Sequence, residues 1–170
     1  FRSLRLDLSK VQPIAFAENS QKPILEVRNL SLFYKKKLVL DDLNLSAAPG
    51  EIIGIIGHNG AGKSTFSRTL CGLHTNCTGQ ILWDGKELNA KSRLKHSYMV
   101  MQDVSYQLFA DTLEKECVFG IKHPDLDAAK QAMERLGIYE YRTHHPNTLS
   151  GGQKQRAAVA VSMVCRKDVL

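Results

Sequence analysis

A glycine-rich segment in the first half of the chain restricts the possible folds most. Residues 57–65 read Gly-His-Asn-Gly-Ala-Gly-Lys-Ser-Thr, which fits the pattern G-x-x-x-x-G-K-[ST]. The apolar run 52–56 precedes it, as expected for a parallel strand buried on both faces, and Phe66 and Leu70 follow at helical spacing. A strand, a glycine loop and a helix in this order predict a site for nucleotide phosphates.

Each fixed position of this loop has a chemical reason. Glycines let backbone N–H groups turn toward phosphate oxygens, Lys63 reaches the terminal phosphates, and Ser64 offers a hydroxyl to Mg²⁺. The alternative interpretation is a glycine-rich turn without a ligand. The predicted strand before the loop and the helix after it argue against that interpretation. The predicted nucleotide-binding residues here are Gly57, Asn59, Gly60, Ala61, Gly62, Lys63, Ser64 and Thr65.

A second candidate anion site lies near the end of the chain. Residues 149–156 read Leu-Ser-Gly-Gly-Gln-Lys-Gln-Arg, and Ser150 can cap a helix that runs to about Val164. Gly151 and Gly152 would let a phosphate approach the positive end of that helix. One nucleotide does not need two such loops from one chain, so this one is predicted to serve a nucleotide held by a partner subunit.

Together, residues 57–65 and 149–156 resemble the Walker A and signature motifs of the ATP-binding cassette (ABC) family. The resemblance covers about residue 24 to the end. It implies ATP and Mg²⁺ as cofactors and a second ABC ATPase domain as partner, in a homodimer, a heterodimer or a tandem protein. It also implies contact in trans with the partner's nucleotide from Ser150, Gly151, Gly152 and Gln153.

Two further residues match the family. Tyr34 matches the aromatic side chain that stacks on adenine, with plain strand core as the alternative. Gln102 matches the glutamine that reaches the metal and the attacking water, with a polar strand end as the alternative. The resemblance thus implies Lys63 and Gln102 as catalytic residues and Ser64 and Gln102 as metal-site residues.

The remaining pattern predicts an α/β fold: a P-loop ATPase core with an N-terminal antiparallel β-subdomain and a helical subdomain at about 105–150. Residues 24–34 and 38–45 have strand composition and are joined by Lys35-Lys36-Lys37. Residues 80–83 predict another strand with a turn at Asp84-Gly85, and residues 97–101 a second buried strand. Asp125 is expected to cap a helix that ends before Gly137, with one apolar face formed by Leu126, Ala129, Met133 and Leu136.

The stretch after Gln102 indicates a subfamily. Residues 107–113 and 117–120 resemble energy-coupling-factor or cobalt-type importers, which take up vitamins or transition-metal ions. Asp103-Val104, where such proteins often carry Asn-Pro, is similar to second cassettes of tandem proteins. Residues 1–22 would then be a linker or the tail of an upstream domain, and 23–170 a partial nucleotide-binding domain.

The family's Walker B strand is an apolar run that ends in Asp and is followed by the Glu that polarises water. Leu170 falls inside the start of such a run, so Asp168 is not the Walker B aspartate. We therefore expect a fragment, truncated before Walker B, of a longer protein. The general-base Glu is not in the chain, and one hypothesis is accordingly a nucleotide-binding fragment without turnover.

Charge and cysteine content leave one further alternative. The formal charge is +6, which would suit a soluble ABC ATPase acting on DNA or ribosomes, but the basic residues are scattered and no nucleic acid is expected as a partner. Cys71, Cys77, Cys117 and Cys165 form no C-x-x-C pair and are interpreted as reduced structural thiols. No apolar run reaches membrane-spanning length, so we expect a cytoplasmic chain held at the inner membrane face by transmembrane transporter subunits.

Overall fold

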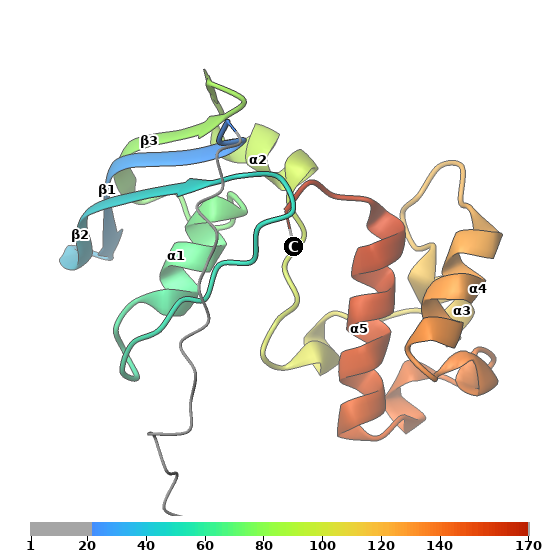
Figure 1. Ribbon diagram of the computed structural model, residues 1–170. Coiled ribbons are helices and arrows are strands. Elements are labelled where there is room, and N and C mark those ends of the chain that lie inside the picture. Colours follow the sequence, from blue (N-terminus) through green and yellow to red (C-terminus); the bar gives the residue numbers. More distant parts are fainter. Residues whose placement is uncertain (1–21, 170) are drawn as a thin grey trace, which may run out of the picture.

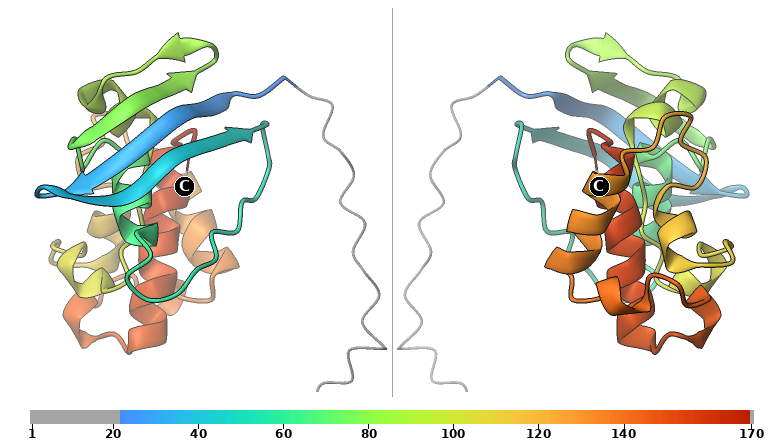
Figure 2. Two further views of the ribbon diagram at one scale, coloured as in Figure 1. Left: turned by 90° about the vertical axis from the view of Figure 1, so that its left-hand side faces the viewer. Right: turned by 90° about the vertical axis from the view of Figure 1, so that its right-hand side faces the viewer.

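The computed structural model describes residues 22–169 of the chain. Figure 1 shows two groups of elements: a twisted sheet with helices α1 and α2 beside it, and a bundle formed by α3, α4 and α5. In the two views of Figure 2, turned by 90°, one group lies in front of the other, with the strands of the sheet in the upper part of the molecule. The predicted linker at 1–22 lies outside the described residues except for Lys22.

The sheet contains β1 (Leu25–Tyr34), β2 (Lys37–Ala47), β3 (Cys77–Trp83) and β4 (Lys86–Glu87). All pairs are antiparallel in the order β2-β1-β3-β4, and Val27 lies opposite both Leu45 and Ile81. The predicted hairpin between the first two strands is confirmed, with Lys35 in the turn at φ 55°. The predicted turn at Asp84-Gly85 is confirmed as well.

One face of this sheet is covered by α1 (Lys63–Leu70). The helix inserts Phe66 among buried side chains of the strands, and it ends where Gly72 takes φ 80°. Burial of such apolar side chains stabilises the fold by about 25 cal/mol per Å². The buried side chains of this cluster are Leu25, Val27, Leu30, Leu32, Ala47, Phe66 and Ile81.

The second core lies between α3 (Leu113–Cys117), α4 (Leu126–Arg135) and α5 (Gly151–Cys165). Asp125 caps α4 by accepting a hydrogen bond from the Ala128 N–H, as predicted. Ala129 and Met133 are buried on the expected face, but Leu126 is 60% exposed because it starts the first turn at the rim of the bundle. Short 3-10 helices connect the parts: η2 (Val104–Tyr106), η3 (Tyr139–Tyr141) and η4 (Pro146–Thr148).

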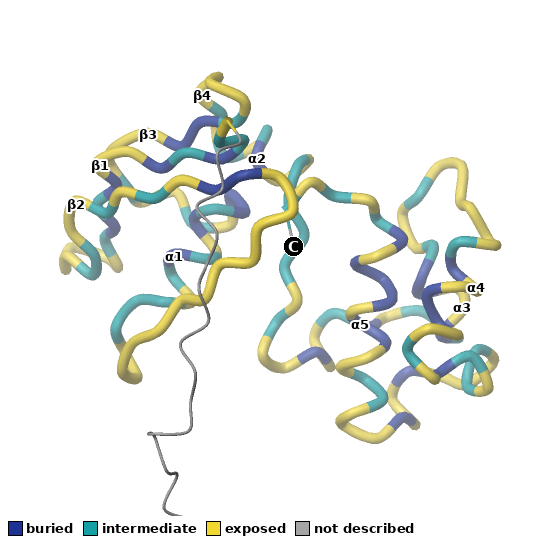
Figure 3. The backbone as a smooth tube through the Cα atoms, in the orientation of Figure 1, coloured by how far each residue is buried: buried dark blue, intermediate teal, exposed yellow. Residues whose placement is uncertain are grey.

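Two predicted strands are not formed. Residues 52–56 run between β2 and α1 without regular structure, in a stretch that Figure 3 draws as exposed. Ile52 and Ile56 are 96% and 97% exposed. A parallel strand needs a neighbouring strand for its hydrogen bonds, and none of the described residues pairs with this segment. Residues 97–101 likewise form no strand, apart from one bridge between Ser97 and Val169.

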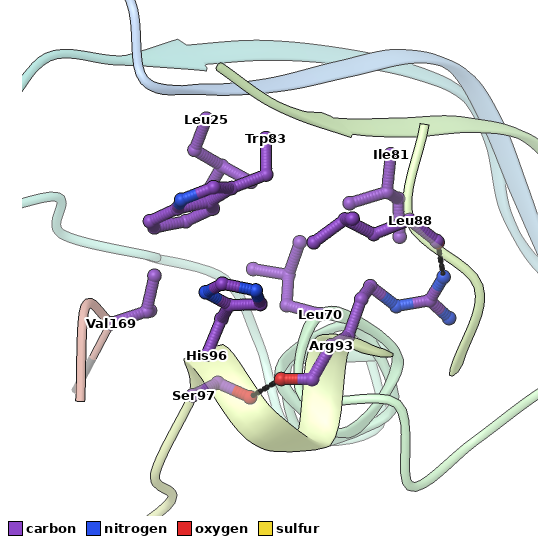
Figure 4. Close-up of a pocket in the computed structure, with 9 residues that line it drawn as sticks. All are labelled: Leu25, Leu70, Ile81, Trp83, Leu88, Arg93, His96, Ser97 and Val169. Carbon is purple, nitrogen blue, oxygen red and sulfur yellow. Dashed lines mark hydrogen bonds between the residues drawn. The ribbon is translucent and has the colours of Figure 1, made fainter. Parts of the chain in front are cut away.

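A small cavity separates the sheet from α2 (Ala90–His96), as Figure 4 shows. Trp83 stacks on His96 with ring centroids 5.7 Å apart, and His96 Nδ1 lies 2.7 Å from Asp168 Oδ2. Arg93 donates to the carbonyl oxygens of Thr69 and Leu88, which joins α2 to α1 and to the end of the sheet. Among the helices that the structure describes, none is long and apolar enough to cross a bilayer.

Candidate functional site

The predicted phosphate loop closes on its own lysine. Lys63 is the first residue of α1, and its Nζ donates to the carbonyl oxygens of Gly57 at 2.6 Å and His58 at 2.8 Å. The Ala61 N–H donates to the same His58 carbonyl at 3.2 Å, which forms a tight turn. The loop therefore curls around the ammonium group at the N-terminal end of a helix.

The backbone at Gly62, where α1 starts, has a conformation and surroundings that only glycine fits. The residue has φ 90°, which side chains rarely tolerate, and an added Cβ would lie 2.7 Å from Val39 Cγ1. As N-cap residue it offers no side chain to the first turn, and no side-chain cap is present. The N–H groups of the first turn and the positive end of the helix dipole therefore remain available to an anion.

The loop lines a wide cleft together with two residues that are far from it in the sequence. Tyr34, at the end of β1, and Gln102, after the 97–101 segment, both line this cleft with residues 58–65. The Tyr34 side chain is 62% exposed, so the alternative of a core tyrosine is wrong. Sequence reasoning missed Lys37, Leu38 and Val39 on β2, although Lys37 pairs with Tyr34 across the hairpin and could have been inferred from it.

The segment that carries Gln102 is held by hydrogen bonds further along the chain. Asp103 accepts from the Ser105 N–H at 3.0 Å and so caps η2, while the Gln102 side chain itself is exposed. Gln107 Oε1 accepts from the Met101 N–H and Gln107 Nε2 donates to the Met99 carbonyl, both at 2.6 Å. Sequence reasoning did not identify this contact, because no local pattern marks a side-chain amide that bonds a segment several residues earlier.

The second predicted anion site lies elsewhere in the same chain. Ser150 caps α5: its Oγ accepts from the Gln153 N–H at 3.4 Å, and Gln153 Oε1 accepts from the Ser150 N–H at 2.7 Å. Gly151 and Gly152 are exposed and line a second cleft with residues 102–105. Tyr34 and the glycine loop thus lie in one cleft and the serine-glycine segment in another, while Gln102 lines both.

The residues that line the cleft fit a nucleoside triphosphate with its magnesium ion. The described residues that line the cleft include Lys37 and Lys63 but no carboxylate, which favours a polyanion. Ser64 is exposed at the start of α1, where its hydroxyl can meet a metal ion. The exposed Tyr34 side chain lines the same cleft, and its flat ring suits an aromatic base.

The cysteines lie in packed parts of the fold. Burial raises the pKa of the Cys71 thiol, and burial together with the nearby Glu116 raises the pKa of Cys117 to about 12, so both are neutral thiols. His74, between Cys71 and Cys77 in the sequence, contacts the Phe33 carbonyl through Nε2 at 2.9 Å and so supports the strand that carries Tyr34.

The glycine loop at the start of α1, the exposed aromatic ring and the capped serine-glycine helix start define a P-loop nucleotide-binding protein of the cassette type. A model of the ABC transporter family matches residues 40–170, and the chain belongs to that family.

Named relatives and a solved structure agree with this assignment. The chain is 47% identical over 144 residues to a putative ABC transporter ATP-binding protein of Treponema denticola, covering 85% of the chain and 29% of that protein. It is 35% identical to the energy-coupling factor transporter ATP-binding protein EcfA1 of Streptococcus sanguinis, covering 86% of the chain and 57% of that protein. The structure of cbiO1 from Clostridium perfringens, part of the ABC transporter complex cbiONQ, superimposes with a TM-score of 0.76 at 28% identity, covering 86% of the chain and 63% of cbiO1.

These matches confirm the predicted family, its α/β P-loop fold and the resemblance to energy-coupling-factor and cobalt-type ATPases. The chain spans about a third to three fifths of the length of the curated relatives it matches.

Proposed function

We propose that this chain binds MgATP in the cleft at the start of α1, as the nucleotide-binding part of an ABC transporter ATPase. The observation that carries the proposal is the convergence of three segments far apart in the sequence: Tyr34, the loop at 57–65 and Gln102 line the same cleft. Each supplies a different chemistry: Tyr34 an aromatic face, the loop hydrogen-bond donors for phosphate oxygens, and Gln102 a polar group for the metal ion.

Lys63, the loop amides and Ser64 form the phosphate end of this site. Lys63 and the N-terminal end of α1 stabilise negative charge on the phosphoryl oxygens, and the effect is strongest where charge develops during transfer. Ser64 and Gln102 would hold the magnesium ion, which would neutralise negative charge on the phosphates. The described residues that line the cleft include no carboxylate, so none of them is proposed as the group that activates water.

A partner cassette completes the site. Ser150, Gly151 and Gly152 present a helix start outside the chain's own nucleotide cleft, which supports contact with a phosphate held by the second cassette. The reciprocal arrangement gives two shared ATP sites. Hydrolysis of the shared ATP then separates the cassettes.

The separation drives a membrane transporter subunit at the inner face of the membrane, in an importer of the energy-coupling-factor or cobalt type. Tyr106, Phe109 and Phe119, which follow Gln102 in the chain, are large aromatic side chains exposed to solvent. Such exposed aromatics suit an interface with an apolar partner surface. The cargo proposed from the resemblance is a vitamin or a metal ion.

The proposal is tested by changing Lys63→Ala in the complete protein and measuring ATP turnover and ATP binding. Loss of both is expected, with thermal stability within about 1 kcal/mol of the wild type, since the Lys63 amine bonds only exposed loop carbonyls. Lys86→Ala is the matched control, because Lys86 is an exposed lysine on β4, outside the cleft lining. Near-normal turnover in Lys63→Ala would contradict the proposal.

A further inference from the structure

The backbone just before Gln102 sets where this exposed side chain stands in the cleft. Among the described residues the segment 99–101 forms no strand, and the bridge nearest to it joins Ser97 to Val169. Side-chain hydrogen bonds to this backbone therefore bear directly on the position of Gln102.

The side-chain amide of Gln107 supplies this support. It accepts from the Met101 N–H and donates to the Met99 carbonyl, both at 2.6 Å, so one amide group satisfies the backbone two residues apart in the way a neighbouring strand would. The opposite polarity of the two bonds fixes the orientation of the amide. The Met101 N–H belongs to the peptide between Val100 and Met101, so this bond holds the backbone one residue before Gln102.

Gln107 is itself held by the helical bundle. Its N–H donates to the Val104 carbonyl at 3.0 Å, and Val104 is buried where η2 packs against α5. On its other side, Glu116 accepts from the N–H groups of Phe109 and Ala110, both at 2.6 Å. Glu116 is only 3% exposed and lies on α3, so it ties the stretch after Gln107 to the bundle.

We propose that Gln107 is a positioning residue for Gln102: its amide transfers the fixed geometry of the bundle to the backbone on which Gln102 stands. This inference rests on the proposed function, because it assumes that Gln102 acts on the metal ion and the attacking water. Gln107 does not touch the nucleotide cleft, so its effect falls on turnover and metal use and leaves nucleotide affinity unchanged.

The test compares Gln107→Leu, Gln102→Ala and the double variant in the complete protein. Gln107→Leu is expected to lower kcat roughly tenfold with KM for ATP within about twofold, because the contacts at Tyr34 and Lys63 are intact. The Mg²⁺ concentration for half-maximal turnover rises several-fold, by roughly the same factor as in Gln102→Ala. The double variant is no slower than Gln102→Ala, because Gln107 acts only through Gln102.

Gln131→Leu, an exposed glutamine on α4, is the matched control and keeps wild-type kinetics. Gln107→Glu is a second variant for the case that leucine disturbs folding: it keeps an acceptor for the Met101 N–H, loses the donor to the Met99 carbonyl, and is expected to show an intermediate loss. Wild-type kcat and Mg²⁺ dependence in both Gln107 variants, or a double variant whose losses multiply, would overturn the inference. Failure of the proposed function is seen separately, as normal turnover in Lys63→Ala.

Discussion

The two glycine-containing helix starts of this chain differ in how they treat their first-turn N–H groups. At α1 the N-cap is Gly62, which has no side chain and leaves the first turn without a side-chain cap. At α5 the N-cap is Ser150, which exchanges hydrogen bonds with Gln153 in a capping box. Compared with a serine cap, the glycine at the α1 start gives up only a few tenths of a kcal/mol, roughly, and it keeps its N–H groups available for a ligand.

We propose that the two helix starts have different tasks. In the proposed function the uncapped start, which shares its cleft with Lys63 and the aromatic ring of Tyr34, holds the chain's own nucleotide. The capped start has its first turn satisfied by its own side chains and exposes Gly151 and Gly152, which we propose contact a phosphate held by another subunit. The two helix starts would then serve binding within the chain and contact between chains.

The largest effect is expected from Gly62→Ala. The new Cβ would meet Val39 Cγ1 at 2.7 Å and would force a side chain into φ 90°, so we expect ATP binding to be lost and the fold to lose roughly 2 kcal/mol or more. Binding of a fluorescent ATP analogue and chemical denaturation measure the two effects.

Gly60→Ala is the matched control for this change. Its φ is 85°, but the space around an added Cβ is open, so only the backbone cost of about 1–2 kcal/mol is expected. Equal binding losses in the two variants would show that the approach of Val39 to the α1 start has no special role.

A smaller effect is expected from Ser150→Ala. The cap of α5 is lost, at a cost of about 1 kcal/mol in the free energy of unfolding. Turnover of the complete protein should fall roughly 100-fold, since a donor to the partner's phosphate is removed as well.

Ser150→Thr keeps the capping hydroxyl and serves as the control, with stability close to that of the wild type. Steady-state ATP hydrolysis measures the effect on turnover, and denaturation curves measure the effect on stability. Full turnover in Ser150→Ala would limit this residue to a structural role.

Tyr34→Ala should act on binding alone. Loss of an aromatic face against the adenine is expected to weaken ATP affinity about tenfold. The side chain is exposed, so the free energy of unfolding should not change measurably, and Tyr34→Phe should bind like the wild type. Unchanged ATP affinity in Tyr34→Ala would show that the ring of Tyr34 does not contact the adenine.

The smallest effect on function is expected at the ordinary capped start of α4. Asp125→Ala removes the hydrogen bond to the Ala128 N–H and an exposed ion pair with Arg166, which together cost about 1 kcal/mol of stability. Turnover per folded molecule should remain at the wild-type level, and Asp125→Asn should restore most of the stability. A fall in turnover would mean that capping as such, rather than the site chemistry, accounts for the Ser150 effect.

Elements set by local chemistry were predictable from sequence. The first turns of α4 and α5 follow from the cap residues Asp125 and Ser150, and the hairpin at 24–45 follows from strand composition on both sides of a lysine turn. The glycine loop was predictable for the same reason, because its pattern already contains the residues that its chemistry needs.

Features that depend on distant partners were not predictable. The apolar run at 52–56 reads as a buried strand, yet a parallel strand forms only beside another strand, and sequence periodicity cannot say whether one is present. The contact of Gln107 with residues 99–101 is also a tertiary one. The glycine loop, Tyr34 and Gln102 were named from the sequence and share one cleft in the structure, but their roles in binding stay predictions. The contact of Gln107 with the backbone before Gln102 emerged only from the structure.

The division between the two helix starts is tested most directly by ATP affinity in dilute complete protein, before cassettes pair. Wild type, Lys63→Ala and Ser150→Ala would be titrated with the same fluorescent ATP analogue in the presence of Mg²⁺. The account predicts binding at least about tenfold weaker in Lys63→Ala and unchanged in Ser150→Ala. Equal weakening in both variants would contradict it, because the signature serine would then bind the chain's own nucleotide.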